Sequence, residues 1–215
     1  MTKSANEKDR VRWVIQRLRA LPSGASILDA GAGEMPYRPY CSHLNYTSQD
    51  LAEYDGQGNE RALQTDSFNA TKVDIVSDIA VIPVADESFD FVLCTEVLEH
   101  VPDPLMALKE LVRVLKPGGR LILTAPFASL VHFAPYHYAS GFSEYYYSYH
   151  LPAIGLDLEE LTKSGSYFEY LTQEVNRLPA IASRYTNTRN PLMRLALKSF
   201  GWGLRWCLAR LARRD

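Results

Sequence analysis

Apolar and polar residues along the first part of the chain repeat in an order typical of alternating strands and helices. Apolar side chains at helical spacing predict an amphipathic helix over residues 5–20, which Pro22 ends, and a second helix over 105–115. Five short segments predict strands, at 26–30, which is apolar and buried, and at 45–50, 73–76, 89–94 and 120–124. Residues 52–70 are polar and aperiodic, which indicates a long surface loop. This order predicts an α/β fold, with a doubly wound, mainly parallel sheet between helices on both faces.

The composition of the 215-residue chain is that of an ordinary globular domain, with 47% hydrophobic and 22% charged residues. These fractions exclude a disordered, collagen-like or coiled-coil chain. The formal net charge is -2, but residues 189–215 hold seven basic side chains and one acidic side chain, so this tail is basic and the rest is acidic. We therefore divide the chain into a domain of residues 1–188, with a lid over about 128–152, and a tail of residues 189–215. No nucleic-acid partner is expected.

The spacing of the cysteines and the polarity of the first twenty residues indicate the cellular compartment of the protein. Cys41, Cys94 and Cys207 are too widely spaced for a disulfide framework or a CxxC metal site, which fits a reducing environment. The first twenty residues lack the apolar run of a signal peptide, and no stretch approaches the roughly 18 apolar residues of a membrane span. We expect a cytoplasmic protein, and the basic tail leaves a peripheral position at the inner membrane surface open.

A glycine-rich turn, Asp29-Ala30-Gly31-Ala32-Gly33, begins at the end of the first predicted strand. Two glycines one residue apart let the backbone approach a ligand closely at the carboxyl end of a strand, where open α/β sheets bind nucleotides. Pro36 stands where a dinucleotide fingerprint has its third glycine, which favours a nucleoside without phosphates. Asp50 ends the second strand at the spacing expected of a carboxylate that binds both ribose hydroxyls. The alternatives are glycines that only form a tight turn and an Asp50 that caps a helix.

Four motifs occur in a fixed order along the chain. They are Leu28-Asp29-Ala30-Gly31-Ala32-Gly33, then Asp78 with Ile82-Pro83 and Asp86-Glu87-Ser88-Phe89-Asp90, then Thr95-Glu96-Val97-Leu98-Glu99-His100-Val101, and last Leu115-Lys116-Pro117-Gly118-Gly119-Arg120-Leu121. With this set the chain resembles the class I S-adenosylmethionine-dependent methyltransferases, in their type 11 branch, over about residues 26–127. The resemblance implies a Rossmann-like, three-layer α/β/α sandwich with strand order 3-2-1-4-5, and we place a sixth strand near 168–172. The stretch Gly-Ala-Gly-Glu-Met-Pro-Tyr, at residues 31–37, also resembles a subgroup of this family that is often found with glycan biosynthesis.

The resemblance implies which residues bind the cofactor, S-adenosylmethionine. Asp29 and the glycine turn would face its methionine part, and Asp50 its ribose. Asp78 can accept a hydrogen bond from the adenine amino group, while Ile79 covers a face of the ring. Glu96 would offset the sulfonium charge, or alternatively pair with a helix N-terminus. The complete predicted set is Asp29, Gly31, Ala32, Gly33, Asp50, Leu51, Asp78, Ile79, Cys94 and Glu96.

The segment after the fifth strand is rich in histidine and tyrosine, and the family builds its acceptor pocket there. A hydroxyl acceptor needs a base, so we predict His132 and His137 as the catalytic residues. Six of the 13 tyrosines lie in this segment, and their rings suit a sugar or another flat acceptor. The potential ligands of the segment match no metal motif, so we predict no metal site; they are His132, His137, Glu144 and His150. His100 is interpreted as a packing or capping residue at the edge of the cofactor site.

The tail from Asn190 to Asp215 mixes leucines and two tryptophans, Trp202 and Trp206, with basic residues. This mixture is typical of an interfacial helix that lies on an anionic membrane. The alternative is a helix that docks on the acidic domain or on a second copy of the chain as a homodimer, which would bury both tryptophans.

These interpretations together predict an S-adenosylmethionine-dependent methyltransferase that acts on a small-molecule, glycan-linked or lipid-linked acceptor. Two alternatives stay open. One is an NAD(P)-dependent oxidoreductase, which Pro36 and the lack of a Tyr-x-x-x-Lys pair in a suitable helix disfavour. The other is a non-catalytic, cofactor-binding protein associated with a membrane. Formation of a methylated product separates it from the enzyme.

Overall fold

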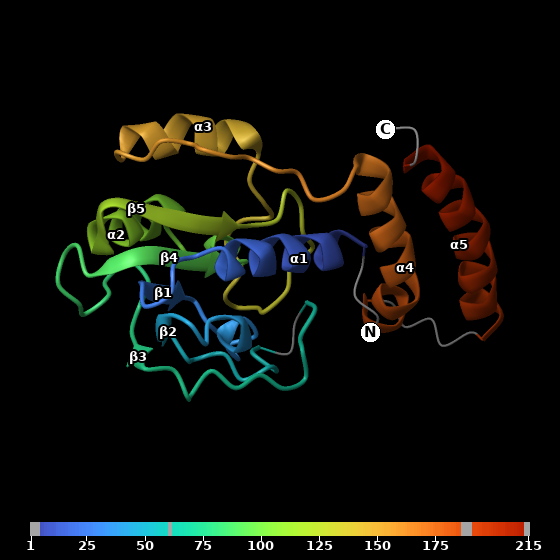
Figure 1. Cartoon of the computed structure of the whole chain (residues 1–215). Helices are drawn as coiled ribbons and strands as arrows, with labels where there is room; N and C mark the ends of the chain where they lie inside the picture. Colours follow the sequence, from blue (N-terminus) through green and yellow to red (C-terminus); the bar gives the residue numbers. More distant parts are fainter. Residues whose placement is uncertain (1–4, 60–61, 186–190, 213–215) are drawn as a thin grey trace. The chain divides into compact units, whose positions relative to one another are not determined.

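The computed structural model describes residues 5–59, 62–185 and 191–212. Five strands form one sheet in the order β3-β2-β1-β4-β5, and all neighbouring pairs are parallel (Figure 1). The strands are β1 (Ser26–Ala30), β2 (Asn45–Asp50), β3 (Ile75–Val76), β4 (Phe89–Thr95) and β5 (Leu115–Thr124). The predicted strand order is therefore confirmed.

The pairing register brings the carboxyl ends of adjacent strands to one edge of the sheet. Ala30 at the end of β1 pairs with Gln49 of β2 on one side and Cys94 of β4 on the other. Thr95 and Thr124, the last residues of β4 and β5, pair with each other. Segments that follow these strands must therefore start side by side, although they are far apart in sequence.

Alternating side chains bury both faces of the sheet. Leu28 of β1 and Val92 of β4 point into an apolar cluster that also contains the buried face of α2 (Pro104–Val114). Ile27 and Leu93, one position along each strand, point to the opposite face and are fully buried as well. Val14 and Leu18, in the second half of α1 (Ala5–Arg19), are also fully buried.

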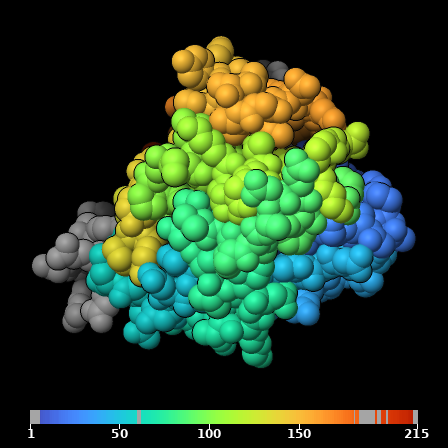
Figure 2. Space-filling view, turned by 90° about the vertical axis from the view of Figure 1, so that its left-hand side faces the viewer, coloured from blue at the N-terminus to red at the C-terminus, as the bar shows by residue number. Residues whose placement is uncertain are grey.

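The amino ends of the strands lie away from the predicted site. The strand arrows in Figure 1 point to the right, so Figure 2, which views the left-hand side, faces their amino ends. There the teal and green segments around β3 and α2 form the surface. We therefore expect the functional site at the carboxyl ends of the strands, among the loops that follow β1, β2, β4 and β5.

The connections differ in how much regular structure they contain. Short 3-10 helices follow β1 and β4, namely η1 (Arg38–Tyr40) and η2 (Leu98–His100). Residues 52–59 and 62–70 contain neither a helix nor a strand among the residues that the structure describes, in agreement with the predicted loop. After β5 a long loop leads to α3 (Glu144–Ala153).

The predicted sixth strand near 168–172 is wrong, because these residues belong to α4 (Tyr167–Tyr185). Phe168, Leu171 and Val175 recur at a spacing of three and four residues, which is helical, and the alternation over four residues was too short to distinguish the two.

Contacts divide the chain into two units. Residues 14–161 contain the sheet, and the other unit combines the first 13 residues with 162–215. In the second unit α4 lies beside α5 (Pro191–Ala212), and Arg205 Nη1 donates a hydrogen bond of 3.0 Å to Asn176 Oδ1 (Figure 1). The boundary that we predict at residue 188 stays a prediction. No helix in the described part of the chain is long and apolar enough to cross a membrane.

Candidate active site

The glycine turn after β1 is tied to the end of β2. Gly31 and Gly33 have positive φ angles of 71° and 53°. The Gly31 amide donates to Gln49 Oε1 at 3.2 Å, and the Gly33 amide donates to Asp50 Oδ2 at 2.9 Å. The two ends of adjacent strands thus hold the turn in one conformation.

A side chain at either glycine would collide with its surroundings. A Cβ at Gly31 would lie 2.4 Å from Cγ2 of Val97, and a Cβ at Gly33 would lie 2.8 Å from Cζ of Phe68. These contacts are shorter than side chains tolerate, so glycine is required for space as well as for φ. Val97 comes from the segment after β4 and Phe68 from the long loop after β2, so three loops meet at this turn.

Asp50 uses both carboxylate oxygens to order the backbone. Oδ2 accepts from Gly33 and Oδ1 accepts from the amide of Ala52 at 2.9 Å. Each oxygen of a carboxylate has a second lone pair, so both can still accept a hydroxyl. Leu51 beside it is exposed, and Ala32 is buried in the turn. The predicted ribose site is therefore geometrically available.

Asp29 lies deeper than its predicted neighbours, with a side chain only 1% exposed. Its Oδ2 accepts a hydrogen bond of 2.6 Å from Tyr46 Oη. Burial, with the nearby charge of Asp50, raises the pKa of Asp29 to about 7, although the bond from Tyr46 acts in the opposite direction. Sequence reasoning missed Tyr46, which is half-buried, and Gln49, which is buried. Their signal was the run of polar residues in a strand that ends in Asp50.

Asp78 and Ile79 follow β3, one strand away from Asp50. Asp78 is exposed, and its Oδ1 accepts from the amide of Ala80 at 2.8 Å. Ile79 instead points into the apolar cluster on the α2 side of the sheet. The amide of Ser77 donates to the carbonyl of Asp50 at 3.1 Å, which places this segment next to the predicted ribose site.

Cys94 and Glu96, on either side of the last residue of β4, lie in different surroundings. Cys94 is fully buried in the apolar cluster, and burial raises the pKa of its thiol. Glu96 has a positive φ of 55°, a strained conformation that is concentrated at functional sites. Its amide donates to the carbonyl of Thr124 at 2.8 Å, and its Oε1 accepts from Thr124 Oγ1 at 3.1 Å. The end of β5 therefore fixes the carboxylate of Glu96.

Aromatic rings connect the glycine turn with the loop after β5. Phe68, which lies against Gly33, contacts Tyr54 and Phe133 at ring-centroid distances of 5.4 and 5.5 Å. Tyr54 stacks on Phe133 at 4.3 Å, and Phe133 stacks on His100 at 5.0 Å. None of these rings was predicted as part of the site, because no motif marks them.

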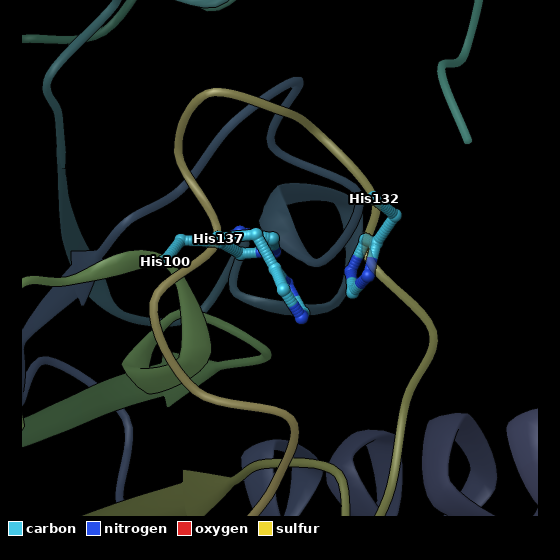
Figure 3. Close-up of side chains that lie close together, drawn as sticks. All are labelled: His100, His132 and His137. Atoms are coloured by element: carbon cyan, nitrogen blue, oxygen red, sulfur yellow. The ribbon is translucent and has the colours of Figure 1, made fainter. Parts of the chain in front are cut away.

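Three histidines from two segments meet beyond these rings (Figure 3). His100 ends η2, whereas His132 and His137 lie in the loop after β5. The His132 ring lies 4.7 Å from that of His100 and 4.8 Å from that of His137. His150, on α3, packs instead on Tyr146 at 4.5 Å. The structure thus unites both predicted catalytic histidines with a third that the sequence assigned to packing.

Residues 28–123 match the family described as "Methyltransferase domain", of type 11. These residues form a methyltransferase domain of this type, and the homologues of the chain are class I S-adenosylmethionine-dependent methyltransferases. The family predicted from the four motifs is therefore confirmed, and S-adenosylmethionine is the methyl donor that it implies.

Two curated relatives extend this comparison. The ubiquinone biosynthesis O-methyltransferase of Xanthomonas axonopodis pv. citri (strain 306) is 36% identical over 118 residues, which cover 54% of this chain and 48% of the relative. The demethylmenaquinone methyltransferase of Clavibacter sepedonicus is 30% identical over 176 residues, 78% of this chain and 65% of the relative. The chain spans about half the length of the first of these methyltransferases.

A solved structure from Bacillus halodurans C-125, assigned as a methyltransferase, shares the fold. It superposes with a TM-score of 0.50 at 21% identity and covers 70% of this chain and 68% of its own. At this identity the likeness concerns the fold alone.

The residues at this edge of the sheet fit the methyl donor that the family implies. The carboxylate of Asp50 suits a pair of ribose hydroxyls, and the exposed carboxylate of Asp78 suits an amino group one strand away. Val97 and Phe68 occupy the positions where side chains of residues 31 and 33 would project, so the two glycines let these loops pack against the turn. The individual contacts assigned to these residues stay predictions.

Proposed function

We propose that this methyltransferase transfers a methyl group from S-adenosylmethionine to a hydroxyl oxygen of a small aromatic molecule. One observation carries the proposal, namely the continuous row of rings from Phe68 at the glycine turn through Phe133 to His100. It joins the predicted cofactor side to the histidines, so a flat acceptor between them would lie against aromatic surface.

Different residues of the chain would bind the cofactor, orient the acceptor and activate its hydroxyl. S-adenosylmethionine, when bound, supplies a methyl carbon that the adjacent sulfonium charge activates. Asp50 and the glycine turn would hold the nucleoside and methionine parts, and Glu96 would lie near the positive charge. The rings would orient the acceptor and exclude water, while His132 and His137, our proposed catalytic residues, would activate its hydroxyl.

The class of acceptor follows from the relatives and the rings together. The relatives are named for ubiquinone biosynthesis and for demethylmenaquinone, both of which concern small molecules. They support the small-molecule part of the sequence prediction and not the glycan-linked part. We therefore propose a hydroxylated aromatic ring of the quinone-precursor type as the acceptor.

Product formation tests the proposal. The purified chain would be incubated with S-adenosylmethionine carrying a labelled methyl group and a panel of catechols and hydroquinones, with mass spectrometry of the products. We expect label on an aromatic oxygen, and calorimetry should show binding of S-adenosylhomocysteine but not of NADH. Binding of NADH alone would favour the oxidoreductase alternative, whereas cofactor binding without any product would favour the non-catalytic one.

A second proposal concerns α5, which we infer lies on an anionic membrane surface. Leu195, Trp202 and Trp206 share one side of the helix, and the tryptophans are 69% and 53% exposed. Leu208, on the opposite side, is 6% exposed. The guanidinium of Arg210 lies 3.8 Å from the ring centre of Trp206, which combines positive charge with an aromatic ring. This arrangement supports an interfacial helix and disagrees with a docked helix that buries both tryptophans.

Flotation with anionic vesicles tests this role of α5. Each basic side chain near such a surface contributes about 1 kcal/mol, so we expect binding that falls at high salt. Trp202→Ala with Trp206→Ala should weaken binding severalfold. Tyr145→Ala with Tyr149→Ala removes two exposed aromatic residues of α3 and serves as the matched control. Equal flotation of the two double variants would contradict the proposal.

A further inference from the structure

We propose that His100, His132 and His137 together bind a divalent transition-metal ion, zinc by chemical preference, which holds and activates the hydroxyl of the acceptor. The role in activation rests on the proposed function, whereas metal binding can be measured without it. The proposal departs from the sequence prediction of no metal site, because His100 was not considered among the potential ligands.

The distances suit a shared ion. One nitrogen from each ring lies within 4.8 Å of the others, and this is the one such group of three among the residues that the structure describes. Zinc–nitrogen bonds of about 2.0–2.1 Å place tetrahedral ligand atoms roughly 3.4 Å apart. Small side-chain rotations therefore suffice to close the site, and Figure 3 shows the three rings gathered within the bend of the loop that carries two of them.

Two of the rings are already oriented through their other nitrogen. Nδ1 of His132 lies 2.8 Å from the carbonyl oxygen of Leu130, and Nδ1 of His100 lies against the carbonyl oxygen of Tyr136. A carbonyl only accepts, so each Nδ1 is the donor and each Nε2 keeps its lone pair. Metal-binding histidines are typically fixed in this way by a backbone carbonyl.

His137 supplies an independent observation. Both of its ring nitrogens are buried, and neither has a hydrogen-bond partner within the described part of the chain. A buried nitrogen without a partner is unfavourable, and such groups in folded proteins are generally satisfied by a ligand, an ion or water. Coordination of one nitrogen of His137 would satisfy it.

The charges and the number of ligands favour a reactive metal rather than a purely structural one. Three neutral imidazoles leave the full charge of the ion, and Oε1 of the buried Glu99 lies 3.8 Å from Nε2 of His100, where it would partly balance that charge. Imidazole ligands suit zinc, cobalt or nickel better than magnesium. With three protein ligands, a fourth position stays open for an oxygen atom.

The open position explains how the histidines would act on the acceptor. A hydroxyl oxygen bound to the ion becomes more acidic, so its O–H bond breaks, the electrons remain on oxygen, and the proton passes to water. The anionic oxygen would then attack the methyl carbon of S-adenosylmethionine; the carbon–sulfur bond breaks, its electron pair stays on sulfur, and neutral S-adenosylhomocysteine leaves.

Cobalt binding tests the site directly. The full chain, without a histidine tag and after dialysis against a chelator, would be titrated with Co²⁺ and followed by visible absorption. We expect one ion per chain. His100→Ala, His132→Ala and His137→Ala should each weaken binding by about tenfold or more. His150→Ala, which removes a histidine outside the cluster, should bind as the unmodified chain does.

Two further measurements keep the outcomes separate. Binding of S-adenosylhomocysteine shows that each variant is folded, and His137→Gln replaces Ala where the smaller side chain unfolds the loop. Failure of the unmodified chain to bind Co²⁺ or Zn²⁺, or equal affinity of the His137 and His150 variants, would overturn the metal site. Methyl transfer that persists in chelator would overturn the role of the ion in activation but leave the proposed function standing. Metal binding without any methyl transfer would overturn the proposed function and the role of the ion in activation but leave the metal site standing.

Discussion

The two sides of the site are held by different kinds of contact. On the cofactor side the polar groups bond to one another: the Gly33 amide to Asp50, and Tyr46 to Asp29. On the acceptor side aromatic rings stack, and His137 keeps two buried nitrogens without a hydrogen bond among the described residues. The predicted cofactor side is thus ordered by the chain itself, whereas the proposed acceptor side contains polar atoms that no described residue satisfies.

This difference has a consequence for substitutions. Changes on the cofactor side remove bonds within the protein, so they should alter cofactor affinity or stability. Changes on the acceptor side remove groups that act on another molecule, so they should alter turnover while the fold and cofactor affinity persist.

The largest expected effect concerns turnover. His132→Ala or His137→Ala should lower kcat by about 100-fold or more, because each removes a group that activates the acceptor. The Kd for S-adenosylhomocysteine should stay unchanged. His150→Ala is the matched control and should keep full activity. If the His132 and His137 variants were as active as this control, the acceptor side would work by positioning alone.

A smaller effect is expected on cofactor affinity. Asp50→Ala should weaken binding of S-adenosylhomocysteine by about 1–3 kcal/mol, since two hydroxyls would lose a charged acceptor. Asp103→Ala is the control, because Asp103 also accepts two backbone amides, those of Leu105 and Met106 at the start of α2. Calorimetry should show a change for Asp50 only, and equal losses would refute the ribose assignment.

Asp29 should make stability depend on pH. Its pKa is raised by burial to about 7, so the folded chain binds a proton more tightly than the unfolded chain, and stability falls as pH rises from about 4 to 7. Asp29→Asn removes this loss and still accepts from Tyr46. We expect the variant to be more stable by up to about 4 kcal/mol at pH 8 and nearly equal at pH 4, in urea unfolding without ligand.

Asp74 provides a control of opposite sign. Hydrogen bonds from Ser48 lower the pKa of Asp74, so its contribution is present above about pH 4 and is lost in acid. Asp74→Asn should therefore be less stable than the unmodified chain at pH 8. If both variants shifted in the same direction, the burial argument for Asp29 would fail.

The smallest predicted effect distinguishes the cost of placing alanine at a positive φ from the added cost of a steric clash. Gly24 and Gly31 both have positive φ, but a Cβ at Gly24 meets nothing within 4 Å, whereas at Gly31 it meets Val97. Gly24→Ala should cost about 1 kcal/mol of unfolding free energy, and Gly31→Ala about 1 kcal/mol more. Urea unfolding of both variants measures the difference, and equal values would show that Val97 moves aside freely.

The position of the predicted cofactor-binding residues at the ends of the strands was predictable, because it depends on local sequence. Asp29 and the glycines directly follow a buried strand, Asp50 ends the next strand, and Asp78 follows a third. Parallel strands bring such ends to one edge whatever the loops do, so strand recognition alone was enough to place them. The same reasoning failed near 168–172, where Phe168 begins a helix and a four-residue pattern does not determine the period.

By itself, the sequence determined the family that the domain resembles, the strand order and the edge of the sheet at which the predicted cofactor-binding residues lie, since these depend on motifs and periodicities within single segments. Only the tertiary structure decided that His100 joins His132 and His137, and that Phe68 reaches across to Gly33. These contacts join loops that have no regular period, and their course is set by packing between segments far apart in the chain. The residue spacing and composition of a single segment therefore do not predict how it packs against another segment.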